Sequence, residues 1–229
     1  MPDPVLLITG ASTGIGAATA RQASEAGYRV VLSARSEDKL RALAEELGGH
    51  ERAIAVRCDV SVWEDQEALV KAALDAFGQI DAAFANAGFG AKRGFLEETP
   101  EQWRSMVETN VLGAAFTIRA TLPHFRERDA GHMILTSSIA GRRVLPGSLY
   151  SATKHAVTAM GEALRQEVSD TPIKVTLIEP GMVDTPFFDD RPTGALQDED
   201  IARTVMFALS QPPHVDLNEI LVRPINQPI

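Results

Sequence analysis

The chain of 229 residues is poor in cysteine and in basic residues, and each shortage excludes a class of protein. Cys58 is the only cysteine, so no disulfide can form within the chain and nothing indicates an oxidising compartment. The 22 Lys and Arg residues against 31 Asp and Glu give a net charge of −9, which argues against a nucleic-acid partner, because phosphate backbones require a basic face. The five histidines have no metal-ligand spacing with one another or with Cys58, and we predict no metal site.

Long hydrophobic runs are also missing. The first apolar run, residues 5–8, is too short for a signal peptide or a membrane span, so we expect a cytoplasmic protein without membrane association. No linker or charge block divides the chain, which predicts a single domain over residues 1–229 with a substrate region at about residues 186–200.

Short apolar segments alternate with helical patterns along the whole chain. The predicted strands are residues 5–8, 29–33, 53–57, 82–85, 132–137, 173–178 and 219–223, and the predicted helices are residues 17–26, 37–47, 62–77, 100–128, 149–168 and 198–210. Strands without polar alternation are typical of a parallel sheet covered on both faces. We therefore predict an α/β protein with a doubly wound parallel sheet, the three-layer Rossmann fold.

A glycine-rich loop joins the first predicted strand to the first predicted helix. Gly10, Gly14 and Gly16 lie where the pyrophosphate of a dinucleotide meets free backbone amides at a helix start. Their spacing, G-x3-G-x-G, departs from the generic G-x-G-x-x-G fingerprint. A tight turn without a ligand is the alternative, although three glycines beside the hydroxyls of Thr9, Ser12 and Thr13 exceed what a turn requires.

Tyr150 and Lys154 are four residues apart in a predicted helix, so they share one face. A nearby ammonium favours the phenolate, which would let the tyrosine exchange a proton with a substrate near neutral pH. The alternative is a surface pair without chemistry, because this spacing occurs by chance on many helices.

Together the motifs resemble the short-chain dehydrogenase/reductase family. In chain order they are Thr9-Gly10-x-x-x-Gly14-Ile15-Gly16, Asn86-Ala87-Gly88, Asn110, Ser138, Tyr150-x-x-x-Lys154 and Pro180-Gly181. The resemblance implies an NAD(P)-dependent oxidoreductase that interconverts a carbonyl and an alcohol by hydride transfer. Tyr150 would be the general acid/base, and Lys154 would lower the pKa of the phenol and bind the nicotinamide ribose.

By the same resemblance, Ser138 would bind the substrate oxygen and Asn110 would organise a proton path through Lys154. Ser137 is the alternative serine, because Ser138 precedes Tyr150 by twelve residues where the family more often has thirteen. The alternative for Asn110 is a polar cap at an interrupted helix.

The cofactor is predicted from the end of the second strand, where dinucleotide enzymes contact the adenosine ribose. The family's acidic position falls on Ala34, and Arg35 follows it, with Ser33 or Ser36 able to add a hydroxyl. A guanidinium suits a 2′-phosphate, so we predict NADP rather than NAD. Alternatively, Arg35 is a solvated residue that caps the next helix and pairs with Glu37 or Asp38.

The resemblance implies further cofactor contacts along the sheet edge. They are Gly10, Ser12, Thr13, Gly14, Ile15 and Gly16 for the phosphates, Asp59 and Val60 for the adenine, Asn86, Ala87 and Gly88 beside the cofactor, and Pro180, Gly181, Val183 and Thr185 for the carboxamide. The alternatives are a helix N-cap for Asp59 and ordinary turns for Asn86 and for Pro180-Gly181.

Two other functions remain open at this stage: an epimerase or dehydratase on the same fold, and a non-catalytic protein that senses NADP. The motifs do not select one small-molecule carbonyl or alcohol substrate. The family pairs helices 100–128 and 149–168 between subunits, and their apolar residues predict a homodimer or homotetramer. These residues include Val111, Leu112, Ala115, Phe116, Val157, Met160 and Leu164.

Overall fold

A computed structural model describes residues 3–90, 92, 94–146, 148–185 and 192–227. Seven parallel strands form the main sheet in the order β3-β2-β1-β4-β5-β6-β9. Their bounds are β1 Val5–Thr9, β2 Arg29–Ala34, β3 Ala53–Arg57, β4 Ala82–Ala85, β5 His132–Thr136, β6 Lys174–Pro180 and β9 Glu219–Val222. The predicted doubly wound parallel sheet is confirmed.

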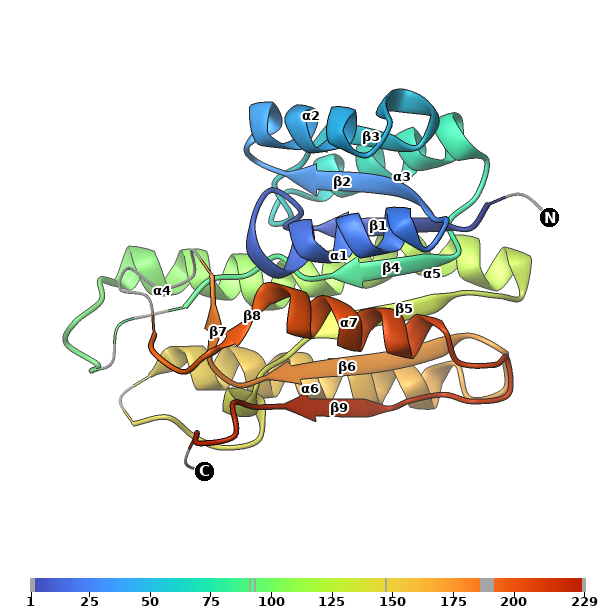
Figure 1. Ribbon diagram of the computed structural model, residues 1–229. Coiled ribbons are helices and arrows are strands. Elements are labelled where there is room, and N and C mark those ends of the chain that lie inside the picture. The colour runs from blue at the N-terminus through green and yellow to red at the C-terminus, as the bar shows by residue number, and fades with distance from the viewer. Residues whose placement is uncertain (1–2, 91, 93, 147, 186–191, 228–229) are drawn as a thin grey trace.

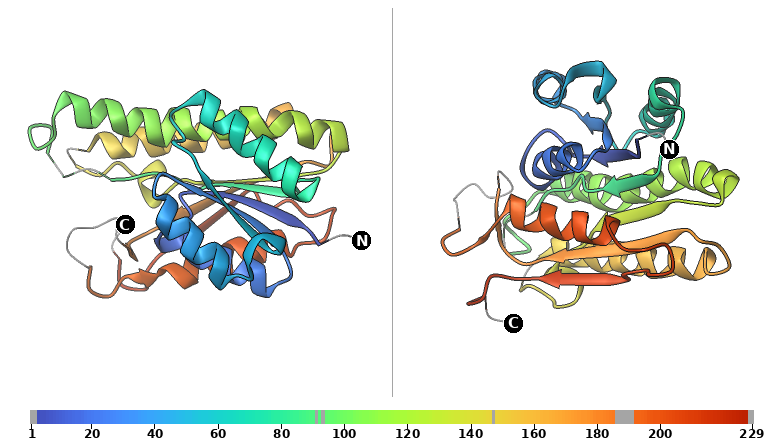
Figure 2. Two further views of the ribbon diagram at one scale, coloured as in Figure 1. Left: turned by 90° about the horizontal axis from the view of Figure 1, so that it is seen from above. Right: turned by 45° about the vertical axis from the view of Figure 1, so that its right-hand side comes forward.

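Helices cover both faces of this sheet (Figures 1 and 2). One face carries α1 (Gly14–Glu25), α2 (Glu37–Glu46) and α7 (Asp198–Leu209), and the other carries α3 (Trp63–Phe77), α5 (Gly113–Arg128) and α6 (Leu149–Glu167). Successive residues of a strand point to opposite faces, and Leu6 and Leu7 accordingly belong to two separate apolar clusters. Both are fully buried, which explains why β1 shows no polar alternation.

The predicted helix over residues 100–128 is interrupted. It consists of α4 (Pro100–Val107), a π-helical segment (Glu108–Leu112) and α5, and Pro123 lies inside α5. Single π-helical turns are frequent at functional sites, and this one contains Asn110. The sequence pattern predicted one continuous helix because the segments directly before and after the π-helical turn are themselves helical.

Two short strands were not predicted: β7 (Val183–Asp184) and β8 (Leu196–Gln197) form a separate parallel pair. Residues 186–191 of the predicted substrate region lie outside the described residues. Of the apolar residues expected at a subunit surface, Val157 and Leu164 are instead buried in the core, whereas Leu112 is 42% exposed. Across the described part of the chain, no helix is both long and apolar enough to span a bilayer.

Candidate functional site

The order of the strands reverses between β1 and β4, and the predicted site residues gather at the carboxyl edge there. Ligands of open α/β sheets bind at such a switch point, because neighbouring connections leave toward opposite faces and separate. β1 leads into α1 on one face, and β4 leads toward α4 and α5 on the other (Figure 1).

Asn86 joins three strand ends at this edge. Its Nδ2 donates to the carbonyl oxygens of Thr9 at 3.2 Å and Gly10 at 3.3 Å, and its Oδ1 accepts from Oγ1 of Thr136 at 3.2 Å. The Thr9 hydroxyl in turn accepts from the backbone N–H groups of Asn86 and Ala87. Asn86 therefore organises the loop through its side chain, which an ordinary turn does not require.

The glycine loop fits tightly against this junction. Gly10 has a φ of +68°, and a Cβ there would lie 2.8 Å from Cα of Ala87, while a Cβ at Gly16 would lie 2.3 Å from the Gly10 carbonyl oxygen. Helix α1 begins at Gly14, and Thr13 at its N-cap makes no capping side-chain bond. The amides of the first turn are thus open to an anion, and the loop fits a dinucleotide pyrophosphate.

At the end of β2, the two residues predicted to contact the adenosine ribose, Ser33 and Arg35, differ in their exposure. Arg35 is exposed, whereas Ser33 is fully buried, so its hydroxyl does not reach the surface and we do not carry it into the cofactor site. Glu37 pairs with Arg41 and not with Arg35, and among the described residues Arg35 has no ion pair. The guanidinium remains available for a phosphate.

Asp59 and Val60 follow β3 on the same edge. The Asp59 carboxylate accepts from the backbone N–H and the hydroxyl of Ser61, while the N-cap of α3 is Val62, so Asp59 does not cap that helix. Partial burial opposes ionisation, but the Ser61 bonds and the charge of Arg35 lower the pKa of Asp59. Val60 is buried.

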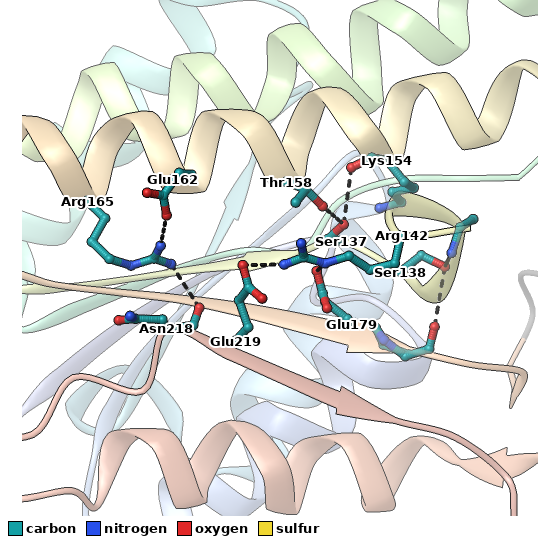
Figure 3. Close-up of polar contacts among 12 residues, drawn as sticks. Ser137, Ser138, Arg142, Lys154, Thr158, Glu162, Arg165, Glu179, Asn218 and Glu219 are labelled. Atoms are coloured by element: carbon teal, nitrogen blue, oxygen red, sulfur yellow. Dashed lines mark hydrogen bonds and ion pairs between the residues drawn. The ribbon is translucent and has the colours of Figure 1, made fainter. Parts of the chain in front are cut away.

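Tyr150 lies in the first turn of α6, and its phenol hydrogen-bonds the hydroxyl of Ser138. Ser138 also accepts from the Ala140 N–H at 3.1 Å and donates to the Pro180 carbonyl at 3.3 Å. Ser137 faces elsewhere: its hydroxyl bonds Thr158 at 2.7 Å and the Lys154 carbonyl at 3.2 Å (Figure 3). The geometry thus favours Ser138 as the partner of Tyr150.

The charge states of this pair differ from the expectation. Burial raises the pKa of Tyr150 to about 12, opposed by the Ser138 hydrogen bond, and burial lowers the pKa of Lys154 to about 8. The expected lowering of the phenol's pKa by Lys154 is not seen. The ammonium donates to the Thr136 carbonyl at 2.8 Å and lies 5.6 Å from the centroid of the phenol ring, so burial dominates. At neutral pH the phenol keeps its proton and the amine keeps its charge.

Asn110 is 1% exposed, and both polar atoms of its side-chain amide form hydrogen bonds. Its Oδ1 accepts from the Phe89 N–H at 3.0 Å, and its Nδ2 donates to the Phe89 carbonyl at 2.9 Å and to the Thr153 hydroxyl at 3.2 Å. Thr153 precedes Lys154, so Asn110 links the segment after β4 to the helix that carries Tyr150. A Cβ at Gly88 would lie 3.1 Å from Oδ1 of Asn110 and 3.6 Å from Nζ of Lys154, which places Gly88 beside both.

The predicted carboxamide contacts follow β6. The Gly181 N–H donates to the Val222 carbonyl at 2.7 Å, which anchors this turn to β9. Val183 is buried in β7, and Thr185 follows that strand. Two side chains that carry hydrogen bonds of the site, Thr136 and Thr153, were not among the predicted site residues. A hydroxyl at the end of a buried strand was the available signal for Thr136.

Comparisons with known proteins agree with this arrangement. The family model of the short chain dehydrogenases matches residues 4–195. An uncharacterized oxidoreductase from Staphylococcus saprophyticus is 38% identical over 231 residues, covering 98% of this chain and 99% of the relative.

Two solved structures have the same fold. An alcohol dehydrogenase from the archaeon Thermococcus sibiricus, complexed with 5-hydroxy-NADP, is 33% identical with a TM-score of 0.91, covering 99% of this chain and 98% of that one. A short chain dehydrogenase/reductase from Burkholderia phymatum, in complex with NAD, is 28% identical with a TM-score of 0.87, covering 96% and 89%. Structural neighbours thus include both an NADP-type complex and an NAD complex.

Proposed function

We propose that this chain, which belongs to the short-chain dehydrogenase/reductase family, interconverts a carbonyl compound and an alcohol with NADP as its preferred cofactor. The observation that carries the proposal is the hydrogen bond between Ser138 and Tyr150. Tyr150 lies one turn of α6 before Lys154, whose amine is buried. This group lies at the same sheet edge as the glycine loop. A proton donor, a hydroxyl partner and a dinucleotide cradle therefore converge on one place.

Each residue of this group has a separate task. Tyr150 remains protonated at neutral pH, so it acts as general acid toward the oxygen of a carbonyl substrate and recovers the proton in the reverse direction. Ser138 hydrogen-bonds the same oxygen and holds it beside the phenol. Lys154 supplies a positive charge under Tyr150, and Asn110 holds the turn of α6 that carries this lysine.

The loop of residues 12–16 would hold the pyrophosphate, and Arg35 would hold the 2′-phosphate. When bound, a nicotinamide dinucleotide supplies the hydride for reduction or accepts it for oxidation. The absence of a carboxylate at Ala34 removes the repulsion that a 2′-phosphate meets in NAD-specific sites.

Replacing Tyr150 with phenylalanine tests the acid/base role. We expect Tyr150→Phe to abolish carbonyl reduction in a screen that follows NADPH absorbance, while the Kd for NADPH stays nearly unchanged. Tyr28, the other tyrosine of the chain, precedes β2 at the opposite edge of the sheet, so Tyr28→Phe is the matched control and should keep its activity. Carbonyl reduction by Tyr150→Phe would contradict the proposal.

Replacing Arg35 with glutamate tests the cofactor choice. We expect Arg35→Glu to lower kcat/KM for NADPH by about 10- to 100-fold, since a charge-assisted contact is exchanged for repulsion, and to leave NADH turnover equal or higher. Arg41→Glu, in the helix α2 that begins two residues after Arg35, is the control, because Arg41 is already paired with Glu37. Equal efficiency of the wild type with NADH and NADPH would overturn the assignment.

We also propose that two or four copies associate through α5 and α6. Val107 and Leu112, which precede α5, are 38% and 42% exposed, and a second copy packed on this side of the molecule would cover them. Size-exclusion chromatography with light scattering measures the assembly, and a monomer at micromolar concentration would contradict it.

A further inference from the structure

One arginine ties the turn that carries Ser138 to two strands of the sheet. Arg142 directly follows the 3-10 segment Ile139–Gly141. Its Nε donates to Oε1 of Glu179 at 2.7 Å, and its Nη2 forms a second ion pair with Glu219 (Figure 3). Glu179 lies near the end of β6 and Glu219 begins β9, so a single side chain connects the turn with both strands.

Both carboxylates lie on the same face of the sheet. In the parallel pairing of β6 with β9, Leu177 is the partner of Glu219 and Glu179 is the partner of Leu221. Residues two apart on a strand share a face, as do paired residues on adjacent strands. Leu177 packs into the apolar cluster beneath α6, so the two carboxylates lie on the α6 side, where the turn lies.

The burial of Glu179 makes this arrangement specific. Its side chain is 2% exposed, and burial raises its pKa while the Arg142 charge opposes that rise. A carboxylate this deep requires a charged partner. With Nε and Nη2 directed at two carboxylates, Arg142 is held in place.

Arg142 and Ser138 each connect the turn after β5 with the end of β6. Oγ of Ser138 donates to the Pro180 carbonyl at 3.3 Å, and Arg142 reaches the adjacent Glu179. Across the turn, a Cβ at Gly141 would lie 2.8 Å from the Lys154 carbonyl oxygen, so the turn packs directly on the backbone of α6. The turn is therefore fixed between the end of β6 and the helix that carries Tyr150.

We propose that Arg142 is a positioning residue for the reaction: by pairing with Glu179 and Glu219 it holds the turn after Ser138, and so the Ser138 hydroxyl, in register with Tyr150. This inference rests on the proposed function, because it takes Ser138 and Tyr150 to be the groups that bind and protonate the substrate oxygen. Arg142 itself contacts neither substrate nor cofactor. Its effect on the rate passes entirely through Ser138.

A double-mutant cycle tests that dependence. Arg142→Gln is expected to lower kcat by about 10- to 100-fold, the size of effect that a misplaced group produces, with the Kd for NADPH within about twofold of wild type. In a Ser138→Ala background the same substitution should change kcat by less than about twofold, because the group it positions is gone. Full multiplication of the two effects would overturn the inference.

The pH dependence of alcohol oxidation gives a second test, because a residue that only stabilised the fold would leave it unchanged. When the phenol ionises, the Ser138 hydroxyl turns from the Pro180 carbonyl and donates to the phenolate, which lowers the pKa of Tyr150, so a displaced serine leaves that pKa higher. Alcohol oxidation requires the phenolate, and we expect Arg142→Gln to shift the rising limb of its pH profile to higher pH, as Ser138→Ala does. An unchanged limb would contradict the inference.

Two controls separate positioning from folding. Arg21→Gln removes an exposed Arg–Glu ion pair between α1 and α2 and should leave both kcat and the pH profile unchanged. Arg142→Gln can also destabilise the fold by leaving Glu179 buried and unpaired, so Arg142→Gln/Glu179→Gln, which removes the unpaired charge, is measured beside it. Recovery of thermal stability with kcat still low supports positioning, and recovery of both overturns it.

The result is distinguishable from a failure of the proposed function. Carbonyl reduction by Tyr150→Phe would refute the function itself. An inactive Tyr150→Phe together with multiplicative effects of the Arg142 and Ser138 substitutions would refute only the role of Arg142.

Discussion

Replacing Asn86 with alanine removes three hydrogen bonds that join β1, the glycine loop and β5. Nδ2 of Asn86 donates to the carbonyl oxygens of Thr9 and Gly10, and Oδ1 accepts from Thr136, at distances of 3.2, 3.3 and 3.2 Å. A protein hydrogen bond contributes about 1 kcal/mol net, so we expect the free energy of unfolding to fall by about 2–3 kcal/mol. The loss of the Gly10 contact should also weaken NADPH binding.

Urea unfolding followed by circular dichroism measures the change in stability, and isothermal titration measures the Kd for NADPH. Asn86→Asp is the matched variant: it keeps an acceptor for Thr136 but turns a carboxylate oxygen toward the carbonyls of Thr9 and Gly10. We therefore expect it to be at least as destabilising as Asn86→Ala at neutral pH. A loss below about 0.5 kcal/mol in Asn86→Ala with an unaltered Kd would refute this account of the junction.

Three other predictions concern buried groups. Burial lowers the pKa of Lys154 from 10.5 to about 8, so the unfolded chain binds more protons between these values, and wild type should gain stability relative to Lys154→Met as pH rises from about 8 to 10.5. Burial lowers the pKa of His132 from 6.5 to about 3, so wild type should lose stability relative to His132→Asn as pH falls through 6.5, by at most about 1.4 kcal/mol per pH unit. Urea unfolding midpoints measured across pH check the Lys154 and the His132 predictions. If the stability of wild type and variant changed in parallel with pH, the corresponding prediction would be contradicted. Gly16→Ala places a Cβ 2.3 Å from the Gly10 carbonyl oxygen and should weaken NADPH binding more than tenfold, which titration checks; a Kd within about twofold of wild type would contradict this.

Periodicity was sufficient for the main architecture. The unbroken apolar run of β1 predicts a strand buried on both faces, and its neighbours in the structure bury it in that way. The same pattern could not reveal the π-helical segment at Asn110, because that turn is stabilised by contacts with Phe89 and Thr153, far away in the chain. It also missed β7 and β8, which have only two residues each.

The tertiary structure corrected the chemistry more than the fold. The spacing of Tyr150 and Lys154 predicted a lowered phenol pKa, yet burial raises it to about 12, because desolvation depends on what packs around the pair. In the same way, Ser33 was a candidate phosphate ligand by its position, but the sheet buries it completely.

The sequence by itself determined three local features: a glycine loop after a strand, an arginine directly after the position where a carboxylate would exclude a 2′-phosphate, and a tyrosine and a lysine on one helical face. These are local properties, encoded by neighbours within a few positions. Only the tertiary structure decided which serine faces Tyr150, what the Lys154 ammonium contacts, and that Arg142 is held between Glu179 and Glu219. Those choices depend on segments up to about eighty residues apart that meet at the sheet edge, where distance, burial and charge pairing act together.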